Sequence, residues 1–295
     1  RPADGERVNL TRDESTSELS IRLQIQGEGP WEDGVVETAW QLYDDLIDLI
    51  PAGLTVTDAL LARVALVRNS AGGVGTASND GGGGREEADD RPVVGRPLRD
   101  LAALVRSWDF ALASLGVAAL NSWLNSAERL DAVGNLDGVR VDRRDVDVFA
   151  ARASELAGLR VALIGHFSQG IRALGDSTEL TVLERVPRGG DLPDSACEFV
   201  LPRMDVVFIT GMTVANKTLP RLLELSSDAR VILTGPSVPC CPEVFAGSVQ
   251  HLASSYVHDG ESARSLAAIG ARSPQLRPAT TRFVVDIGEQ AWASP

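Results

Sequence analysis

The sequence predicts an α/β fold in which a parallel sheet fills the second half of the chain. Short apolar runs recur there, and a helix-like segment lies between each run and the next. Strands and helices that alternate at this spacing indicate a parallel sheet with right-handed crossovers. The predicted strands are 160–165, 179–184, 204–210, 230–234 and a weaker one at 248–253; the predicted helices are 168–174, 194–201, 214–226, 242–247 and 259–269.

The first of these strands carries the most specific pattern. The apolar run 161–164 ends on Gly165, and Ser168 then opens a helix as its expected N-cap. A strand, a glycine turn and a helix N-terminus form a place where an anion can bind. Glu184 follows Gly165 by nineteen positions, where dinucleotide-binding units place the acid that contacts a ribose. The loop reads GHFSQG rather than GxGxxG, so the pattern favours a Rossmann-like domain and leaves a nucleotide open as cofactor.

Composition limits the class of protein. A chain of 295 residues predicts two domains. The formal net charge of −13 argues against nucleic acid and anionic membranes as partners. The apolar stretch 110–120 is too short to span a bilayer, and no secretory signal opens the sequence, so we expect a cytoplasmic protein. A homodimer is compatible with the sequence, which does not determine the oligomeric state.

The first half reads as a smaller α+β unit. Residues 1–30 are expected to form an arm or an edge strand, and apolar positions at helical spacing predict a helix over 31–50. Alternation over 60–68 and 74–78 predicts a hairpin closed by Gly72 and Gly73. The Gly-rich and acidic segment 79–92 reads as a loop, for which metal binding is a weaker alternative.

Two helices should complete this first unit. One begins at Pro97, and the second, capped by Ser107, is apolar almost all round and therefore buried. Asn121 and Asn125 lie one turn apart on it, and their amides are expected to bond either to the helix end or to the second domain. The charged segment 126–144 is predicted as a linker. The predicted division is an arm at 1–30, a first domain at 31–144 and a Rossmann-like domain at 145–295.

The residues that follow each predicted strand are polar or glycine. In an open parallel sheet the ligand lies beyond the carboxyl ends of the strands, so these residues are the candidate binding site. They are Gly165, His166, Phe167, Glu184, Thr210, Gly211, Thr213, Asn216, Lys217, Gly235, Pro236 and Ser237.

Two of these side chains are the candidates for chemistry. His166 follows a core strand and suits a metal ligand or an acid–base group. Lys217 is the single lysine among 28 basic residues, and a compact ammonium near a helix start suits a phosphate or carboxylate. The adjacent Cys240 and Cys241 are weaker metal candidates, because neighbouring side chains diverge.

At these residues the chain resembles a heavy-metal chelation family of bacteria and archaea. The similar motifs are IGHF at 164–167, ITGMTVANKTL at 209–219, LTGPSVP at 233–239 and the helix segment LGVAALNSWL at 115–124, which contains Asn121. The resemblance implies a first domain similar to the N-terminal domain of enolase, a Rossmann-like second domain and a site in the cleft between them. It also implies a role in metal handling.

Two hypotheses follow. In the first, the interdomain cleft binds a metal ion or a metal-bearing anionic small molecule, with His166 and Glu184 as metal ligands and Lys217 on the anionic group. In the second, the chain is a cofactor- or nucleotide-dependent enzyme acting on a small molecule, in which Glu184 holds a ribose, His166 acts as acid or base, and both His166 and Lys217 are catalytic.

Overall fold

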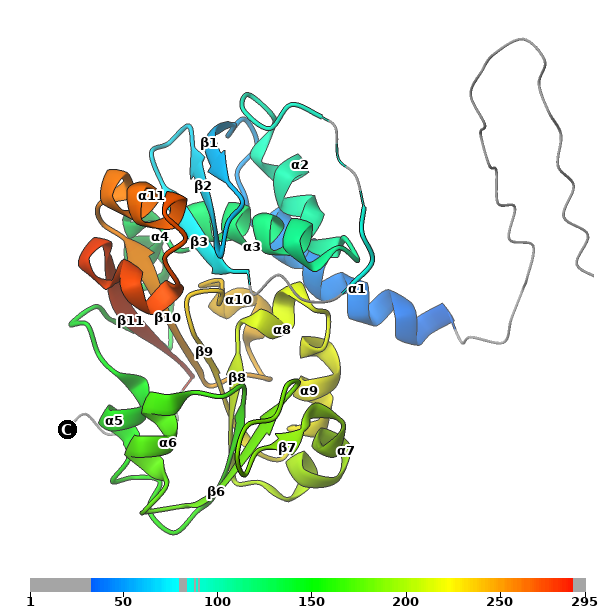
Figure 1. The fold of residues 1–295 in the computed structure, drawn as a ribbon, viewed down its shortest axis with the longest axis vertical. Helices are drawn as coiled ribbons and strands as arrows, with labels where there is room; N and C mark the ends of the chain where they lie inside the picture. Colours follow the sequence, from blue (N-terminus) through cyan, green and yellow to red (C-terminus); the bar gives the residue numbers. More distant parts are fainter. Residues whose placement is uncertain (1–32, 80–83, 88, 90, 289–295) are drawn as a thin grey trace, which may run out of the picture.

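The computed structural model describes residues 33–79, 84–87, 89 and 91–288, and these form two lobes, each built on its own sheet (Figure 1). The α/β prediction is confirmed: a three-stranded antiparallel sheet lies in one lobe and an eight-stranded, mainly parallel sheet in the other. The predicted arm at 1–30 lies outside the described residues. Within the described part of the chain, no helix has the length and apolar content needed to cross a membrane.

The small lobe contains one sheet with helices against it. Helix α1 (Asp33–Asp48) leads into strands β1 (Val56–Leu60), β2 (Val64–Asn69) and β3 (Val74–Ser78), which pair in that order. Helices α2 (Leu98–Ala102), η1 (Ala103–Arg106) and α3 (Phe110–Leu124) follow. A Cβ on Gly75 would lie 2.1 Å from the backbone nitrogen of Ser122, so glycine is what lets β3 approach α3 this closely.

The other face of this small sheet is covered by a segment from the far end of the chain. Helices α11 (Gly260–Ala268) and η4 (Ser273–Ala279) lie against the sheet (Figure 1). Ion pairs of 2.6 Å join Arg68 to Glu261 and Arg264 to Asp58. The small lobe therefore combines both halves of the sequence. The contacts between the small sheet and the segment 260–279 are buried and apolar. They involve Val64, Leu66, Val74, Ala263, Ala267, Ala271, Leu276 and Ala279.

The large sheet has the order β4-β11-β10-β9-β8-β5-β6-β7. Six neighbouring strands are parallel: β5 (Arg160–Ile164), β6 (Glu179–Glu184), β7 (Leu192–Pro193), β8 (Val206–Thr210), β9 (Arg230–Thr234) and β10 (His251–Val257). Their order along the sheet is that of a Rossmann fold: successive strands are added on one side of β5 up to β7, and from β8 onward they are added on its other side, so the strand order reverses between β5 and β8. Ligands of such sheets bind at this reversal point.

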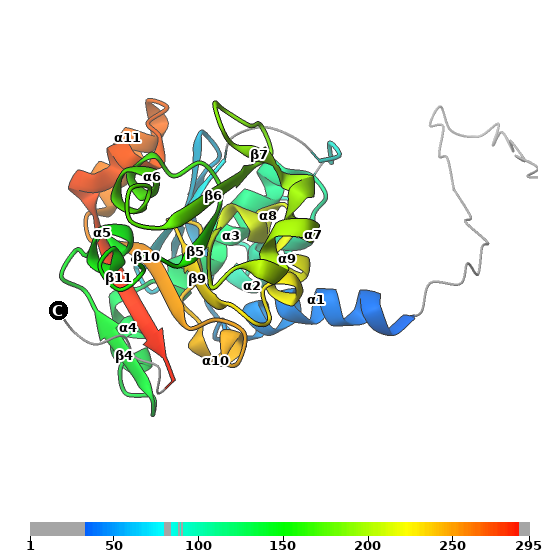
Figure 2. The ribbon, with the colours of Figure 1, turned by 90° about the horizontal axis from the view of Figure 1, so that it is seen from below.

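Two strands that the sequence did not reveal extend the large sheet on one side. Strand β11 (Thr280–Ile287) pairs antiparallel with β10, and β4 (Val139–Asp142) pairs antiparallel with β11 (Figure 2). The sheet is therefore mixed rather than wholly parallel. The segment expected to be a linker instead forms β4 and the helix α4 (Ala127–Val133).

The connecting helices of the large lobe are short, and most lie where the pattern predicted. They are α5 (Val148–Arg152), α6 (Ser168–Leu174), η2 (Asp194–Ala196), α7 (Cys197–Val200), η3 (Leu201–Arg203), α8 (Met212–Ala215), α9 (Leu219–Leu225) and α10 (Pro242–Phe245). Two predicted N-caps are wrong. The cap of α3 is Asp109 rather than Ser107, because its carboxylate accepts from the N–H groups of Ala111 and Leu112, and the cap position of α6 is Phe167 rather than Ser168.

Candidate functional site

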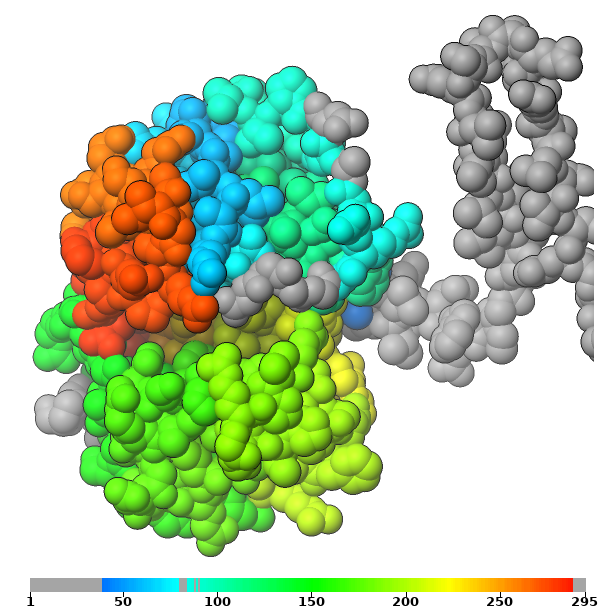
Figure 3. Space-filling model, viewed as in Figure 1, coloured from blue at the N-terminus to red at the C-terminus, as the bar shows by residue number. Residues whose placement is uncertain are grey.

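A cleft of about 1370 Å³ lies where the two lobes meet (Figure 3). Its floor is formed by the carboxyl ends of β5, β6, β8 and β9, as expected for this strand order. Twelve of the thirteen predicted site residues line it. They are Gly165, His166, Phe167, Glu184, Thr210, Gly211, Thr213, Asn216, Lys217, Gly235, Pro236 and Ser237.

His166 is oriented by a carboxylate that the sequence did not reveal. Its Nδ1 lies 2.8 Å from Oδ2 of Asp191, whose side chain is only 5% exposed. The same oxygen accepts the backbone N–H of Arg188 at 3.0 Å. A carboxylate on Nδ1 favours the tautomer that carries the proton there, which leaves Nε2 with a lone pair. Nε2 has no hydrogen-bond partner within the described part of the chain, so it can act as a ligand or a base in the cleft.

Glu184 fixes the loop that carries His166. Its Oε2 accepts the backbone N–H of His166 at 2.9 Å, and its Oε1 accepts that of Val186 at 3.3 Å. The carboxylate thus joins the end of β6 to the end of β5. Each oxygen already has a backbone donor, and a ribose or a metal would have to share that oxygen.

Glycines shape the floor of the cleft. Gly165 and Gly235 directly follow β5 and β9, with φ of 108° and 111°, a region that side-chain-bearing residues rarely adopt. A Cβ on Gly211 would lie 2.6 Å from the carbonyl carbon of Ser237, so glycine allows the loops after β8 and β9 to touch. Ser237 in turn accepts the backbone N–H of Ser78, at the end of β3, with 2.8 Å between the atoms. The small lobe therefore contacts the floor directly.

Lys217 joins the two lobes. Its Nζ donates to the carbonyl oxygens of Ser107, in the small lobe, and Ala215, the latter at 2.7 Å. Nζ also lies 5.5 Å from the ring centre of Phe110 and 6.0 Å from that of Trp108. Burial lowers the pKa of Lys217 to about 8, partly opposed by the carboxylates of Glu87 and Asp109. Its backbone adopts φ 66°, which is strained for a residue with a side chain.

Asn121 on α3 and Asn125 at its C-cap also join the lobes, so of the two expected partners, the helix end and the second domain, the structure shows the second domain. Asn121 does not line the cleft; its Nδ2 donates to the carbonyl of Pro236 at 3.1 Å. Asn125 donates to the carbonyl of Val238 at 3.0 Å and accepts the N–H of Cys240 at 2.8 Å. Both side chains are buried, so these bonds hold the loop after β9 against the small lobe.

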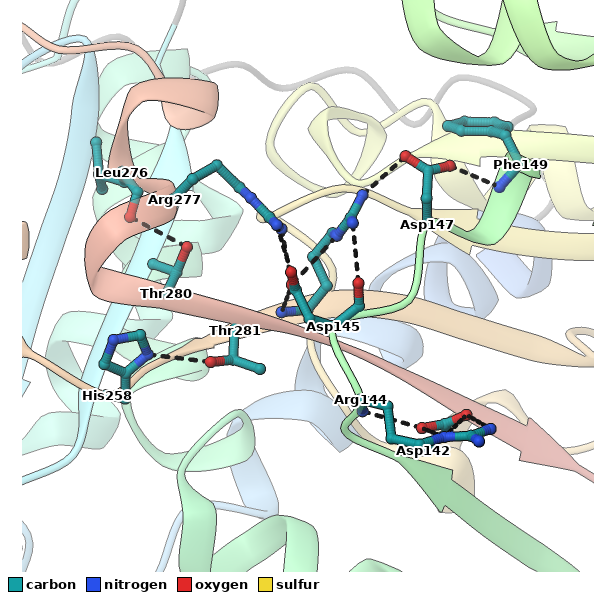
Figure 4. A network of polar contacts seen from close by, with 11 residues as sticks. Asp142, Arg144, Asp145, Asp147, Phe149, His258, Leu276, Arg277, Thr280 and Thr281 are labelled. Carbon is teal, nitrogen blue, oxygen red and sulfur yellow. Dashed lines mark hydrogen bonds and ion pairs between the residues drawn. The ribbon is translucent and has the colours of Figure 1, made fainter. Parts of the chain in front are cut away.

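A network of ion pairs (Figure 4) contains three residues that line the cleft, namely Asp147, Arg277 and Arg282. Asp145 accepts hydrogen bonds from the guanidinium of Arg277 on η4, at 2.5 and 2.9 Å, and from the backbone N–H of Arg282 on β11, at 3.1 Å. Arg282 also bonds to Asp147 at 2.8 Å. The bond from Arg277, against an opposing effect of burial, helps hold the pKa of Asp145 down to about 2. Arg277 and Arg282, two of the arginines that line the cleft, are therefore neutralised by carboxylates.

The side chains of the described residues do not by themselves make a metal-chelating set. In the part of the chain that the structure describes, no three His, Cys, Asp or Glu residues come together in a way that could hold an ion. Cys240 and Cys241 are fully buried, and burial raises the pKa of the Cys240 thiol to about 12 and that of Cys241 well above its ordinary value. Thiolates are the metal-binding form, so this pair is poorly suited to the task. The weaker metal-binding alternative for the acidic loop 79–92 stays a prediction, because two of its carboxylates, Asp80 and Asp90, lie outside the described residues.

The fold and the cleft define a two-lobed α/β protein whose site lies at the strand reversal of a Rossmann-type sheet. Two family models match the chain, over residues 43–124 and 147–285, and each carries the description "Putative heavy-metal chelation". The chain belongs to this heavy-metal chelation family.

Similar proteins span most of the chain. A crystal structure of a protein of unknown function from Desulfitobacterium hafniense is 33% identical, covers 85% of this chain and 99% of its own, and has a TM-score of 0.77. A second such structure, from Pyrococcus horikoshii, is 21% identical with a TM-score of 0.69 over 84% and 99% of the two chains, which supports the fold alone. An uncharacterized protein of Methanocaldococcus jannaschii is 27% identical over 66% of this chain and 73% of its own.

Proposed function

We propose that the interdomain cleft binds a metal ion as a complex with an anionic small molecule, and that Nε2 of His166 contacts the metal. The observation that carries this proposal is the His166–Asp191 pair, with 2.8 Å between Nδ1 and Oδ2 and Nε2 left without a partner among the described residues. Ligand histidines in metalloproteins commonly donate their second N–H to a carboxylate in this way.

The shortage of protein ligands favours a metal that arrives already chelated. One imidazole does not complete the coordination of a heavy-metal ion, and the described residues offer no set of three ligands around the cleft. A small molecule with carboxylate or phosphate groups would supply the remaining donor atoms. The cleft volume of about 1370 Å³ leaves room for such a complex, because drug-sized ligands occupy sites of roughly 300–1,000 Å³.

Elemental analysis of the full chain tests the proposal. The protein is incubated with Ni²⁺ or Zn²⁺, with and without citrate, and desalted before the metal is measured. We expect metal to be retained with citrate, and His166→Ala to abolish this retention. His258→Ala is the matched control, because His258 lies outside the cleft and bonds to Thr281 at 3.0 Å. Equal retention by both variants would refute a role of His166 as a ligand.

An enzyme that uses His166 as an acid or base is the second candidate. The same hydrogen bond from Nδ1 to Asp191 favours it, since a carboxylate-oriented imidazole is a common general base. A ribose at Glu184 is less well supported, because both carboxylate oxygens accept backbone N–H groups. The enzyme hypothesis predicts that His166→Ala loses turnover while the metal content stays normal, which is the reverse of the first proposal.

A further inference from the structure

The lining of the cleft has an excess of basic side chains, although the protein as a whole is acidic. Among the described residues, eight basic and four acidic side chains line it, whereas the whole chain has a formal net charge of −13. A cleft with this local excess concentrates anions even when the overall charge repels them. The acidic side chains are Asp147, Glu184, Asp194 and Glu198.

Five of the eight basic groups already have partners. Arg277 and Arg282 bond to Asp145 and Asp147, as described above, and Lys217 bonds to two carbonyl oxygens. Arg221 bonds to Glu198 at 2.6 Å, and Arg185 lies 3.6 Å from Asp194. The other three, Arg63, Arg188 and Arg272, form no ion pair with any residue that the structure describes. These three guanidinium groups are therefore available to a ligand.

Two of the three arginines lie on neighbouring segments at the small-lobe side. Asn79, at the end of β3, donates its backbone N–H to the carbonyl of Arg63 at 2.9 Å. The preceding residue, Ser78, lies 2.7 Å from Ser273 between hydroxyl oxygens, and Arg272 comes directly before Ser273. Ser78 also bonds to Ser237 after β9. Arg63 and Arg272 thus come from segments that meet beside the loop after β9, and both line the cleft. We call these two arginines the first basic pole.

The third arginine marks a second pole beside His166. The backbone N–H of Arg188 and Nδ1 of His166 share the same oxygen of Asp191, at 3.0 and 2.8 Å. His166 follows β5, and β8 separates β5 from β9 in the sheet. Neighbouring strands are about 4.8 Å apart, so the ends of β5 and β9 lie about 10 Å from each other. The cleft therefore presents two basic poles at separate positions.

We propose that the ligand of this cleft carries two separated anionic groups, one held by Arg63 and Arg272 and the other by Arg188 beside His166. The inference rests on the proposed function in using the same cleft, and it adds the charge pattern of the small molecule. Guanidinium groups bind carboxylates and phosphates through paired hydrogen bonds, so both chemistries fit the poles. A long dicarboxylate and a sugar bisphosphate are the two sources of such a pattern.

Calorimetric titration of the full chain at low ionic strength tests the two poles. The probes are acetate, succinate, adipate and suberate as a length series, with fructose 1,6-bisphosphate as the phosphate arm. We expect one of the longer dianions to bind at least about tenfold more tightly than acetate. Tighter binding of the bisphosphate than of every dicarboxylate assigns the poles to phosphate, and the reverse assigns them to carboxylate.

Single variants test the named residues. Arg63→Gln, Arg272→Gln and Arg188→Gln should each weaken binding of the best probe about tenfold, since a charge-assisted hydrogen bond is lost. Arg203→Gln is the matched control, because Arg203 is exposed on η3 and does not line the cleft. Binding of the best probe that is unchanged in all three cleft variants, or a best probe no tighter than acetate, would overturn the inference.

The failure of this inference is distinguishable from failure of the proposed function. If no dianion binds but metal retention still requires His166, the two-pole ligand is wrong and the metal proposal stands. If dianions bind through the three arginines but metal retention does not depend on His166, the metal proposal is wrong and the two-pole ligand stands.

Discussion

The imidazole of His166 and the carboxylate of Asp191 form a hydrogen-bonded pair across 25 positions of sequence, with 2.8 Å between Nδ1 and Oδ2. His166 ends the turn after β5, and Asp191 precedes β7, two strands away in the sheet. The carboxylate is nearly buried, whereas the imidazole is 22% exposed and lines the cleft. Asp191 thus fixes the orientation of the His166 imidazole.

Asp191→Asn should weaken metal retention about 10- to 100-fold without removing it, because the orienting partner of a metal-binding histidine is changed while Nε2 remains. His166→Ala should remove retention altogether. The measurement is a titration with Ni²⁺ in citrate followed by elemental analysis. Retention by Asp191→Asn equal to that of the unaltered chain would show that the pair only supports the loop.

The amine of Lys217 should titrate near pH 8 rather than near 10.5, because burial disfavours its charged form. Reaction with acetic anhydride, followed by peptide mapping, reads this amine without interference, since Lys217 is the chain's single lysine. The rate of acetylation should reach half its maximum at about pH 8. A midpoint near 10.5 would mean that Nζ is solvated and that its contact with the small lobe is absent in solution.

Lys217→Gly should be more stable than Lys217→Ala by about 1 kcal/mol, because glycine tolerates φ 66° and alanine does not. Both variants lose the bonds from Nζ to Ser107 and Ala215, so their difference isolates the backbone strain. Urea unfolding of the two variants gives the comparison. A more stable alanine variant would contradict the left-handed conformation at this position.

Asn125→Ala should lower the free energy of unfolding by about 2 kcal/mol, since it leaves the buried N–H of Cys240 without a protein partner and removes one of the two donors to the carbonyl of Val238. Asn135→Ala is the control and should change it by less than about 0.5 kcal/mol, because Asn135 is exposed. Equal losses in the two variants, measured by urea unfolding, would refute the role of Asn125 in joining the lobes.

Stability should decline as the pH falls below the ordinary pKa of histidine, because burial lowers the pKa of His251 in the folded state. The unfolded chain then binds a proton that the folded chain does not, so the contribution is complete above about pH 6.5 and is lost as the pH falls below it. The slope from this group is at most about 1.4 kcal/mol per pH unit. His251→Gln should flatten it, and His258→Gln should not, in unfolding measured at pH 7.5 and 5.5.

The central strands were predictable because each is a short apolar run that ends on a glycine or a polar residue. Strand β5 has the predicted start and stops one residue earlier, and β6 and β9 match their predicted bounds. Strand β11 follows the proline-containing η4 and mixes polar with apolar residues, so the sequence has no long continuous apolar run that would predict it. Strand β4 has four residues and depends on β11 for its pairing. Such edge strands are set by tertiary contacts rather than by local pattern.

The candidate site was predictable in location but less so in the partners of each side chain. Twelve predicted residues line one cleft because parallel strands place their carboxyl ends on one edge. Asp191 was not predicted, because its contact with His166 depends on the path of the loop 185–191 and not on the spacing of the two residues in the sequence. Lys217 was predicted to face an anion, yet its ammonium contacts carbonyl oxygens of both lobes. This contact depends on where the fold places Ser107 of the small lobe, which the local sequence around Lys217 does not indicate.

The cover that α11 and η4 provide for the small sheet has a consequence for how the protein is made. Arg68 and Glu261 are 193 positions apart, so the small sheet, whose strands leave the ribosome first, is covered only after most of the large lobe has been made. Until residues 260–279 emerge, the apolar side chains of Val64, Leu66 and Val74 lack their native partners. Contacts between residues so far apart in the sequence slow folding, and they leave apolar surface of the nascent chain exposed until the later residues are made. A chain cut short before residue 260 would therefore leave the ribosome with its earliest sheet still open on one side.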